Sequence, residues 1–336
     1  MKILMDYHHQ DAHLGRHLLF KERLGHDLFL PYGMDWYDKG ILNYKSPDIA
    51  KQFLDDLFLD RDKNITQDSY DKTKAVPGTP SVTYEEFMDT HFDLFMYSQD
   101  PFLLSWKGKD MLTFDKVGLH LAYLNRGYCS PCPEYISNFL TSCKKSYEIN
   151  GHALNKLLYL EEFDVEYWRY KTINPNKTVV SLTHHLRRIE NEGDRWDSLQ
   201  KKMSDFSFRM YGIESDIFEI KKKIHERDLL LSINWLWHPK WHDGYGFVVH
   251  RSFAMGRPPI INWEYFQHKT LGRLLKDTEN CLYLDDNLVA MESKLTKYSQ
   301  PDELHRISKN ARDTFLEHYN WEKQAYNVKQ WLNNLI

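Results

Sequence analysis

The hydrophobic positions of the chain alternate between short apolar runs and segments with helical spacing. The first thirty residues hold the apolar run KILMDY, then a segment whose apolar residues recur three or four apart until Gly25, and then the run HDLFLP. This order predicts a strand, a helix and a second strand. It is the start of a βαβ unit, the repeating element of a parallel sheet.

Three further apolar stretches predict strands in the first half of the chain: FDLFMYS (92–98), KVGLHLAYL (116–124) and ISNFLTSCKKSYEI, the last turning from strand into helix. The polar stretch 60–83 contains Pro77, Gly78 and Pro80, which favours a long connection without regular structure. The alternation of strands with helices predicts an α/β fold with a parallel sheet.

A domain boundary is predicted at TINPNKT (172–178), a short polar segment without hydrophobic period. The alternation then starts again. The predicted order is a strand at TVVSLTHHL, a Lys-rich helix at 198–204, a strand at 206–212, an amphipathic helix at 217–228 and a strand at 229–238. We therefore expect two similar α/β halves.

Composition narrows the class of protein. The 336 residues suggest about two domains, and 42% hydrophobic with 27% charged residues is the balance of a globular chain, which excludes disordered and collagen-like proteins. The net charge of −4 is too even for a general nucleic-acid binder. No apolar stretch is long enough to span a membrane, no signal peptide is evident, and four cysteines make no disulfide framework. We expect a reduced, cytoplasmic protein.

The most informative segment is WHPKWHDGYGFVVHRSFAMGRPPIIN (237–262). A strand is predicted to end at Trp237 and a polar, glycine-containing loop to follow; a helix should begin near Gly246 and end at Gly256, before a strand at PIIN. A glycine turn before a helix presents unpaired backbone N–H groups and the positive end of the helix dipole, which suits a diphosphate. The same pattern also occurs in α/β proteins without a ligand there.

Part of this segment, DGYGFVVHRSFAMGRPPII, resembles the donor-binding signature of GT-B glycosyltransferases similar to family four. Asp243 takes the first acidic position of the signature. The following positions match it at Gly244, Tyr245, Gly246, Ala254, Gly256 and Pro258. A second segment, ISKNARDTFLEHYNWEKQAYNVKQWL (307–332), is similar to the ending of the same enzymes.

The resemblance implies a GT-B fold, in which two Rossmann-like α/β domains face a cleft. It implies an acceptor domain at 1–173, a nucleotide-sugar domain at 174–318, and a C-terminal helix at 319–336 that crosses back to the N-terminal domain. The implied activity moves a sugar from a nucleotide-sugar donor to an acceptor hydroxyl with retention of configuration. A UDP-sugar is favoured over a GDP-sugar as donor, and no metal or other cofactor is expected.

The acceptor is left open by the sequence. A glycan, a lipid-linked intermediate or a hydroxymethylated base in DNA are the alternatives, and the even net charge disfavours DNA. Two further alternatives concern the activity itself: a GT-B-like binding protein without catalysis, and another Rossmann-type enzyme such as a nucleotide-sugar epimerase.

Three residues are candidates for catalysis. Asp243 is placed at a helix N-terminus facing the donor sugar, with a plain helix cap as the alternative. His8 and His9 end the first strand, at the edge where open α/β sheets bind ligands. For each histidine, a purely structural role is the alternative. The candidate donor-binding residues are Lys240, Gly244, Tyr245, Gly246, Phe247, Arg251, Arg187, Arg188 and His184.

Arg251 is a departure from the signature, since it stands where the family has a ribose-binding acidic residue. An arginine cannot accept a hydrogen bond from a ribose hydroxyl, although it can contact a diphosphate. The first loop also lacks the usual glycine pair and supplies only Gly15. The chain is therefore interpreted as a divergent member, and lost turnover is one reading of the Arg251 position.

An arginine pair and a CxxC motif each have a functional and a structural interpretation. Arg187 and Arg188 can bind a diphosphate or form ion pairs with nearby glutamates. Cys129 and Cys132 form a CxxC motif, but no second pair completes four zinc ligands. We therefore expect no metal site.

Overall fold

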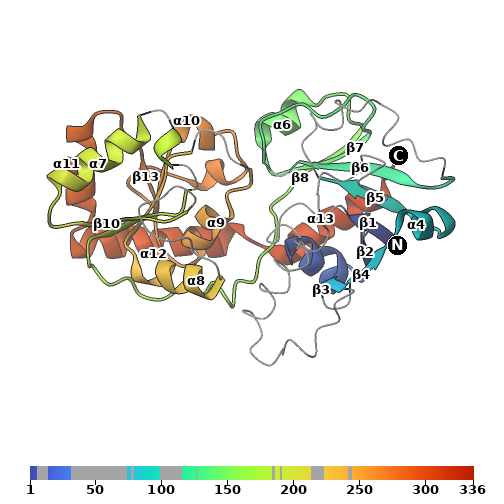
Figure 1. Cartoon of the computed structure of the whole chain (residues 1–336), viewed down its shortest axis with the longest axis horizontal. Helices are drawn as coiled ribbons and strands as arrows, with labels where there is room; N and C mark the ends of the chain where they lie inside the picture. The colour runs from blue at the N-terminus through green and yellow to red at the C-terminus, as the bar shows by residue number, and fades with distance from the viewer. Residues whose placement is uncertain are drawn as a thin grey trace. The chain divides into compact units, whose positions relative to one another are not determined.

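The computed structural model describes residues 1–5, 14–31, 74–76, 79–98, 116–125, 127–183, 186–189, 191–212, 223–240 and 244–336 (Figure 1). The chain forms two compact units. Unit 1 comprises Met1–Phe163 and Trp321–Ile336, and unit 2 comprises Asp164–Asn320.

The change of unit falls after Phe163, ten residues before the predicted boundary at 173. Residues 164–173 belong to unit 2 because long-range hydrogen bonds join them to the rest of that unit. Arg257 Nη1 donates to Lys171 O (2.8 Å), and His305 Nε2 donates to Ile173 O (3.0 Å). The residues that precede the polar segment 172–178 therefore already belong to unit 2.

The sheet of unit 1 has eight strands in the order β3-β4-β2-β1-β5-β6-β7-β8. All neighbours are parallel except β3 and β4. The strands are β1 (Lys2–Met5), β2 (Asp27–Pro31), β3 (Lys74–Val76), β4 (Thr79–Val82), β5 (Leu94–Tyr97), β6 (His120–Asn125), β7 (Asn138–Thr141) and β8 (Asn155–Leu158). Apolar clusters cover both faces: Ile3 and Met5 belong to one, Leu4 and Phe95 to the other. Burial on both faces is typical of a parallel sheet.

The helical elements of unit 1 include the helix that returns from the end of the chain. They are η1 (His17–Arg23), α4 (Tyr84–Asp89), α6 (Lys144–Ile149) and α13 (Trp321–Asn333). Ala325, Val328 and Trp331 of α13 lie in the same apolar cluster as Ile3 and Met5 of β1. The last helix is therefore part of the core of the N-terminal unit.

The prediction of no regular structure in 60–83 is wrong for 74–76 and 79–82, which form β3 and β4. Pro80 lies in β4 and is tolerated because β4 pairs with β3 in a shifted, irregular register. On its other side β4 pairs with β2, where Ser81 of β4 lies opposite Leu30 of β2. The described residues do not include 60–73.

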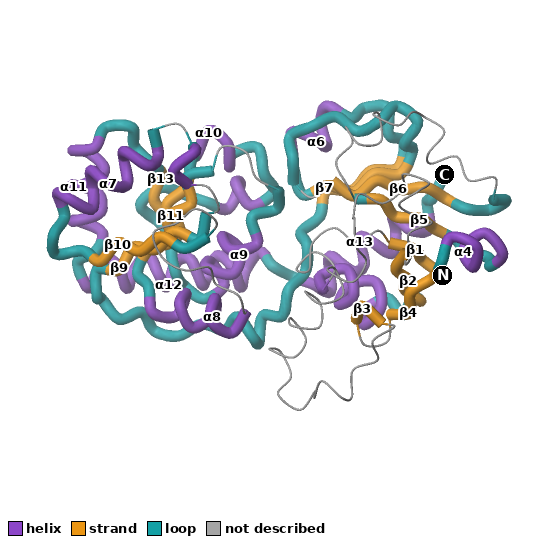
Figure 2. Tube along the Cα trace, viewed as in Figure 1, coloured by secondary structure: helices purple, strands orange, loops and turns teal. Residues whose placement is uncertain are grey.

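The sheet of unit 2 has five parallel strands in the order β10-β9-β11-β12-β13, drawn in orange in Figure 2. The strands are β9 (Thr178–Ser181), β10 (Ser207–Met210), β11 (Trp235–His238), β12 (Pro259–Ile261) and β13 (Leu282–Tyr283). The helical elements are η4 (Leu186–Arg188), α7 (Glu192–Lys202), α8 (Lys223–Ser232), α9 (Phe247–Ala254), α10 (Trp263–Phe266), η5 (Leu271–Leu274), α11 (Leu288–Tyr298) and α12 (Pro301–His318).

The predicted strand at 229–238 is wrong in its first half. Helix α8 continues to Ser232, whose Oγ donates to Leu229 O (2.7 Å), and the strand starts only at Trp235. A continuous apolar run is compatible with either a buried strand or the buried side of a helix, so its pattern alone does not place the change.

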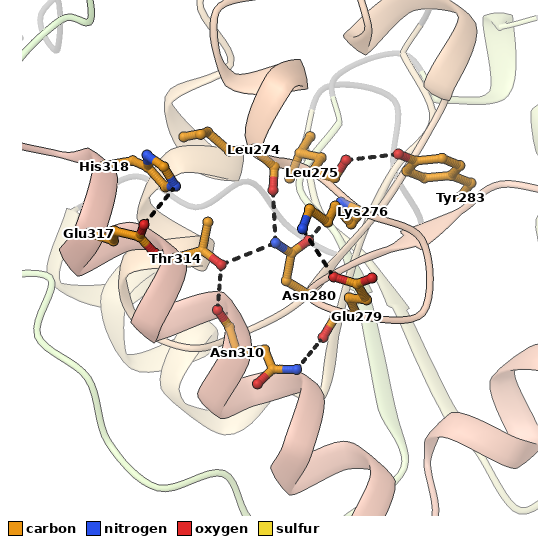
Figure 3. A network of polar contacts seen from close by, with 10 residues as sticks. All are labelled: Leu274, Leu275, Lys276, Glu279, Asn280, Tyr283, Asn310, Thr314, Glu317 and His318. Carbon is orange, nitrogen blue, oxygen red and sulfur yellow. Dashed lines mark hydrogen bonds and ion pairs between the residues drawn. The ribbon is translucent and has the colours of Figure 1, made fainter.

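The connection between β12 and β13 is fixed to α12 by side-chain amides (Figure 3). Asn280 Nδ2 donates to Leu274 O (2.8 Å) and to Thr314 Oγ1 of α12 (3.2 Å), and Asn310 Nδ2 of α12 donates to Glu279 O (3.0 Å). These bonds hold the end of this connection in place. None of the helices in the described ranges combines the length and the hydrophobicity that a transmembrane helix requires.

Candidate functional site

The strand order of unit 2 points to one edge of its sheet. β10 lies on one side of β9 and β11 on the other, with Trp235↔Val179 and Leu236↔Val180 in register. In open parallel sheets, ligands bind outside the carboxyl ends of the strands where the order reverses in this way. Thr183, just after β9, and His238, at the end of β11, are both buried at that edge. The candidate site therefore lies at the carboxyl ends of β9 and β11.

The loop after β11 leads into helix α9 through residues 244–246, which we name the glycine turn. Gly246 is the N-cap of α9 and has φ 77°, a left-handed conformation that only glycine adopts without strain. Val249 N (2.9 Å) and His250 N (3.3 Å) donate to Gly246 O, which closes the first turn. The predicted helix from near Gly246 to Gly256 is thus confirmed. Its N-terminus carries the positive partial charge that suits an anionic ligand.

A buried lysine lies beside the glycine turn. Lys269 Nζ donates to Gly244 O (2.5 Å) and lies 4.4 Å from the ring centre of Tyr265, and the residue is only 3% exposed. Gly244 is itself buried. The carbonyl of the turn is therefore held by a cation from the connection after α10.

An aromatic stack packs against Tyr245 of the turn. The ring of Tyr245 lies on the ring of His250 (4.0 Å between centres, 12° between planes), and His250 Nδ1 is 2.7 Å from Tyr319 Oη. Tyr319 stacks in turn on Phe315 of α12 (4.2 Å). Burial raises the pKa of Tyr319 well above its ordinary value, so its phenol keeps its proton. Tyr245 is consequently packed inside the unit, only 5% exposed.

Arg251 makes a buried ion pair. Its Nη1 is 3.1 Å from Glu226 Oε1 of α8, and its guanidinium lies over the rings of Trp168 (4.5 Å) and Phe247 (5.3 Å). The side chains of Arg251 and Glu226 are 3% and 13% exposed. Arg251 thus joins α9 to α8 and to the segment after Phe163, and its predicted contact with a donor stays a prediction.

The remaining predicted cations have different placements. Arg187 in η4 donates to both carboxylate oxygens of Asp197 in α7 (2.8 and 3.1 Å). Lys240 follows β11 and is half-buried. The backbone of Arg188 belongs to η4, but its side chain lies outside what the structure describes.

Four of the predicted residues lie outside the described part of the chain. They are His8, His9, His184 and Asp243. Their roles stay predictions.

Three residues near the turn were missed by sequence reasoning: Lys269, Tyr319 and Glu226. Each reaches the turn or α9 from 25 to 69 residues away in the chain. No spacing rule relates such distant positions, so a single sequence carries no local signal for them.

Three cysteines of unit 1 lie in close contacts, two with each other and one with a histidine. Cys129 Sγ and Cys143 Sγ are 3.1 Å apart, and Cys132 Sγ is 3.3 Å from His152 Nε2. Burial raises the pKa of the Cys132 thiol to about 12, so it is protonated at neutral pH. The described residues contain no cluster of three or more His, Cys, Asp or Glu side chains suited to a metal ion.

Comparison by sequence gives no match, neither to a family model nor to a curated protein. Comparison by structure does. HepE of Anabaena, in complex with UDP-glucose, matches over 100% of both chains with a TM-score of 0.68 and 11% identity. An α-glucosyltransferase, in complex with UDP and a DNA 13-mer containing an HMU base, matches 99% of this chain and 100% of its own with a TM-score of 0.59 and 11% identity.

TarM matches over 72% of this chain with a TM-score of 0.57 and 12% identity, and this chain spans only 55% of the TarM chain. The structures that match over their full length are GT-B glycosyltransferases. Together with the two parallel-sheet units, these matches show that the chain has the GT-B fold.

Proposed function

We propose that this protein is a glycosyltransferase that moves a sugar from a nucleotide-sugar donor to an acceptor hydroxyl. The observation that carries the proposal is the N-terminus of α9, headed by Gly246 in the left-handed conformation, which follows β11 at the reversal of strand order in unit 2. A backbone turn of this kind at that edge of the sheet suits a diphosphate. Unit 2 would bind the donor and unit 1 the acceptor.

The reaction breaks the bond between the sugar anomeric carbon and the diphosphate oxygen and forms a bond from the acceptor oxygen to that carbon. The acceptor hydroxyl gives its proton to a phosphate oxygen of the leaving group or to solvent, and negative charge develops on the diphosphate as it leaves. In our proposal the α9 amides, Lys240 and Arg187 stabilise that charge, with Arg188 and His184 beside them. Asp243 orients the donor sugar, and His8 and His9 contact the donor phosphate or the acceptor. Retention and independence of metal rest on the family resemblance.

A UDP-sugar is the donor we propose. Support comes from the neighbours that were solved with UDP or UDP-glucose. Isothermal calorimetry should give a measurable Kd for UDP and a weaker one for GDP. Asp243→Ala should weaken UDP-sugar binding, whereas Asp313→Ala, an exposed carboxylate of α12 paired with Lys309, should leave it unchanged. An absence of binding by every nucleoside diphosphate and nucleotide sugar would contradict the proposal.

Hydroxymethylated DNA is the second acceptor to test, because one structural neighbour was solved with DNA containing an HMU base. The net charge of −4 offers little general attraction for DNA phosphates. A glycan or lipid-linked acceptor is therefore our first choice. Salt-dependent binding of hydroxymethylated duplex, absent with unmodified duplex, would reverse that order. Donor binding without any release or transfer of sugar would instead identify a GT-B-like binding protein.

A further inference from the structure

The glycine turn is held at two of its residues by side chains distant in sequence. Lys269 contacts the carbonyl of Gly244, and Tyr319 contacts the histidine on which Tyr245 stacks. Neither Lys269 nor Tyr319 belongs to the donor-binding residues expected from the sequence. Both are buried, so each contact is shielded from competing water.

The lysine contact fixes the direction of a backbone amide. A peptide group is planar, so the carbonyl of Gly244 and the N–H of Tyr245 turn together. The ammonium of Lys269 holds that carbonyl at 2.5 Å and is itself placed over the ring of Tyr265. A charge-assisted bond of this kind is stronger than a neutral one. Orientation of the first amide of the turn is thus set by a side chain outside the turn.

The tyrosine contact fixes the aromatic side of the turn. Tyr319 Oη lies 2.7 Å from His250 Nδ1, which sets the plane of the imidazole ring. Tyr245 lies nearly parallel to that plane at 4.0 Å. Tyr319 is anchored by stacking on Phe315, so the position of α12 determines the position of Tyr245.

We infer that Lys269 and Tyr319 are positioning residues that hold the glycine turn in the shape that presents the N-terminus of α9 to a diphosphate. Neither residue touches the ligand in this account. The expected effect on diphosphate binding rests on the proposed function, whereas the expected effect on the conformation of the glycine turn does not.

Hydrogen exchange of the free protein tests the effect on the turn. Amides in 245–250 should exchange about 10-fold faster in Lys269→Met than in the wild type, since a charge-assisted bond is lost. The matched control is Lys294→Met, a half-buried lysine of unit 2 that binds Asp277 and the carbonyl of Tyr283. Equal exchange of 245–250 in both variants would overturn the inference.

Tyr319→Phe is a milder test that keeps the ring and removes only the hydroxyl. Its control is Tyr283→Phe, which removes a phenol hydrogen bond to Leu275 O (2.8 Å) elsewhere in unit 2. Faster exchange of 245–250 in Tyr319→Phe alone supports the inference, and equal exchange in the two variants overturns it. If Lys269→Met does not fold, this pair decides the question.

Calorimetry tests the effect of each variant on UDP binding, at a temperature well below the Tm of that variant. A residue that serves only global stability leaves the Kd of the folded protein unchanged. Lys269→Met should weaken UDP binding about 10-fold and Tyr319→Phe about 3-fold, and both controls should match the wild type. Wild-type affinity in both positioning variants would overturn the inference. A wild type that binds no nucleotide would overturn the proposed function, while the exchange result would still judge the turn.

Discussion

Replacing Arg251 with methionine should destabilise unit 2 through the carboxylate that it leaves behind. Arg251 Nη1 lies 3.1 Å from Glu226 Oε1, and the two side chains are 3% and 13% exposed. Methionine keeps much of the volume but places no charge beside Glu226. The carboxylate would then remain in a poorly hydrated site with the guanidinium gone.

The expected loss follows from that burial. Removing one partner of a buried ion pair costs about 3–5 kcal/mol, and the remaining solvent access of Glu226 places this pair at about 3 kcal/mol. The lost cation–π contact with Trp168 adds about 1 kcal/mol. Glu226→Gln retains an acceptor oxygen and should cost only about 1–2 kcal/mol. The double variant should be more stable than the sum of the single losses predicts, by about 1–2 kcal/mol, since the ion pair is then removed as a whole.

Urea unfolding followed by circular dichroism measures these changes in the free energy of unfolding. Arg306→Met is the matched control, because Arg306 pairs with Glu303 on an exposed face of α12 and should change stability by less than about 1 kcal/mol. If Arg251→Met unfolds at the same urea concentration as Arg306→Met, or if the two single losses simply add, the buried pair does not stabilise the fold as argued.

Further predictions concern glycine, pH and a helix end. Gly256→Ala should lower the free energy of unfolding, measured by thermal unfolding, by more than about 3 kcal/mol, because the φ of Gly256 is 67° and a Cβ would lie 2.5 Å from the Tyr170 ring. Gly25→Ala should lower it by only about 1–2 kcal/mol, because Gly25 has a similar φ of 71° but open space around it. Burial raises the pKa of Glu192 from 4.5 to about 7, although its ion pair with Arg195 acts in the opposite direction. The folded state should therefore be more stable below pH 4.5 than above pH 7, by about 3 kcal/mol, and this stability is lost as the pH rises through that range. Urea unfolding across that range should show the loss in the wild type and not in Glu192→Gln; parallel curves would contradict it. Lys116→Met should lower stability by about 1–3 kcal/mol, because Lys116 Nζ binds three carbonyls at the end of α4, and unchanged unfolding would refute that role.

The elements that the sequence predicts well carry strong local signals. Gly25 and Gly256 end helices with positive φ, as their positions after apolar periodic segments indicate. The strands at 178–181 and 259–261 are short apolar runs that start beside a polar or proline-containing segment. The α/β class and the parallel sheets follow from this alternation.

The features that the sequence does not predict depend on contacts between distant residues. The unit boundary after Phe163 depends on Arg257 binding Lys171 O, 86 positions apart. The supports of the glycine turn depend on Lys269 and Tyr319, which no motif singles out. The glycine turn itself could be predicted because its glycines and the following helix lie together in the chain, whereas its supports come from elsewhere in the fold.

Glycosyl transfer by this chain is tested by following the sugar and the nucleoside diphosphate that a nucleotide sugar yields. Purified protein incubated with UDP-glucose and other nucleotide sugars should slowly hydrolyse the donor to free sugar and nucleoside diphosphate in equal amounts. With a suitable acceptor, nucleoside diphosphate should form faster and the sugar should appear on the acceptor. Asp243→Ala should slow both reactions. Release of neither product from any nucleotide sugar, with a folded protein and with acceptors of each class present, would contradict the assignment of glycosyl transfer to this chain.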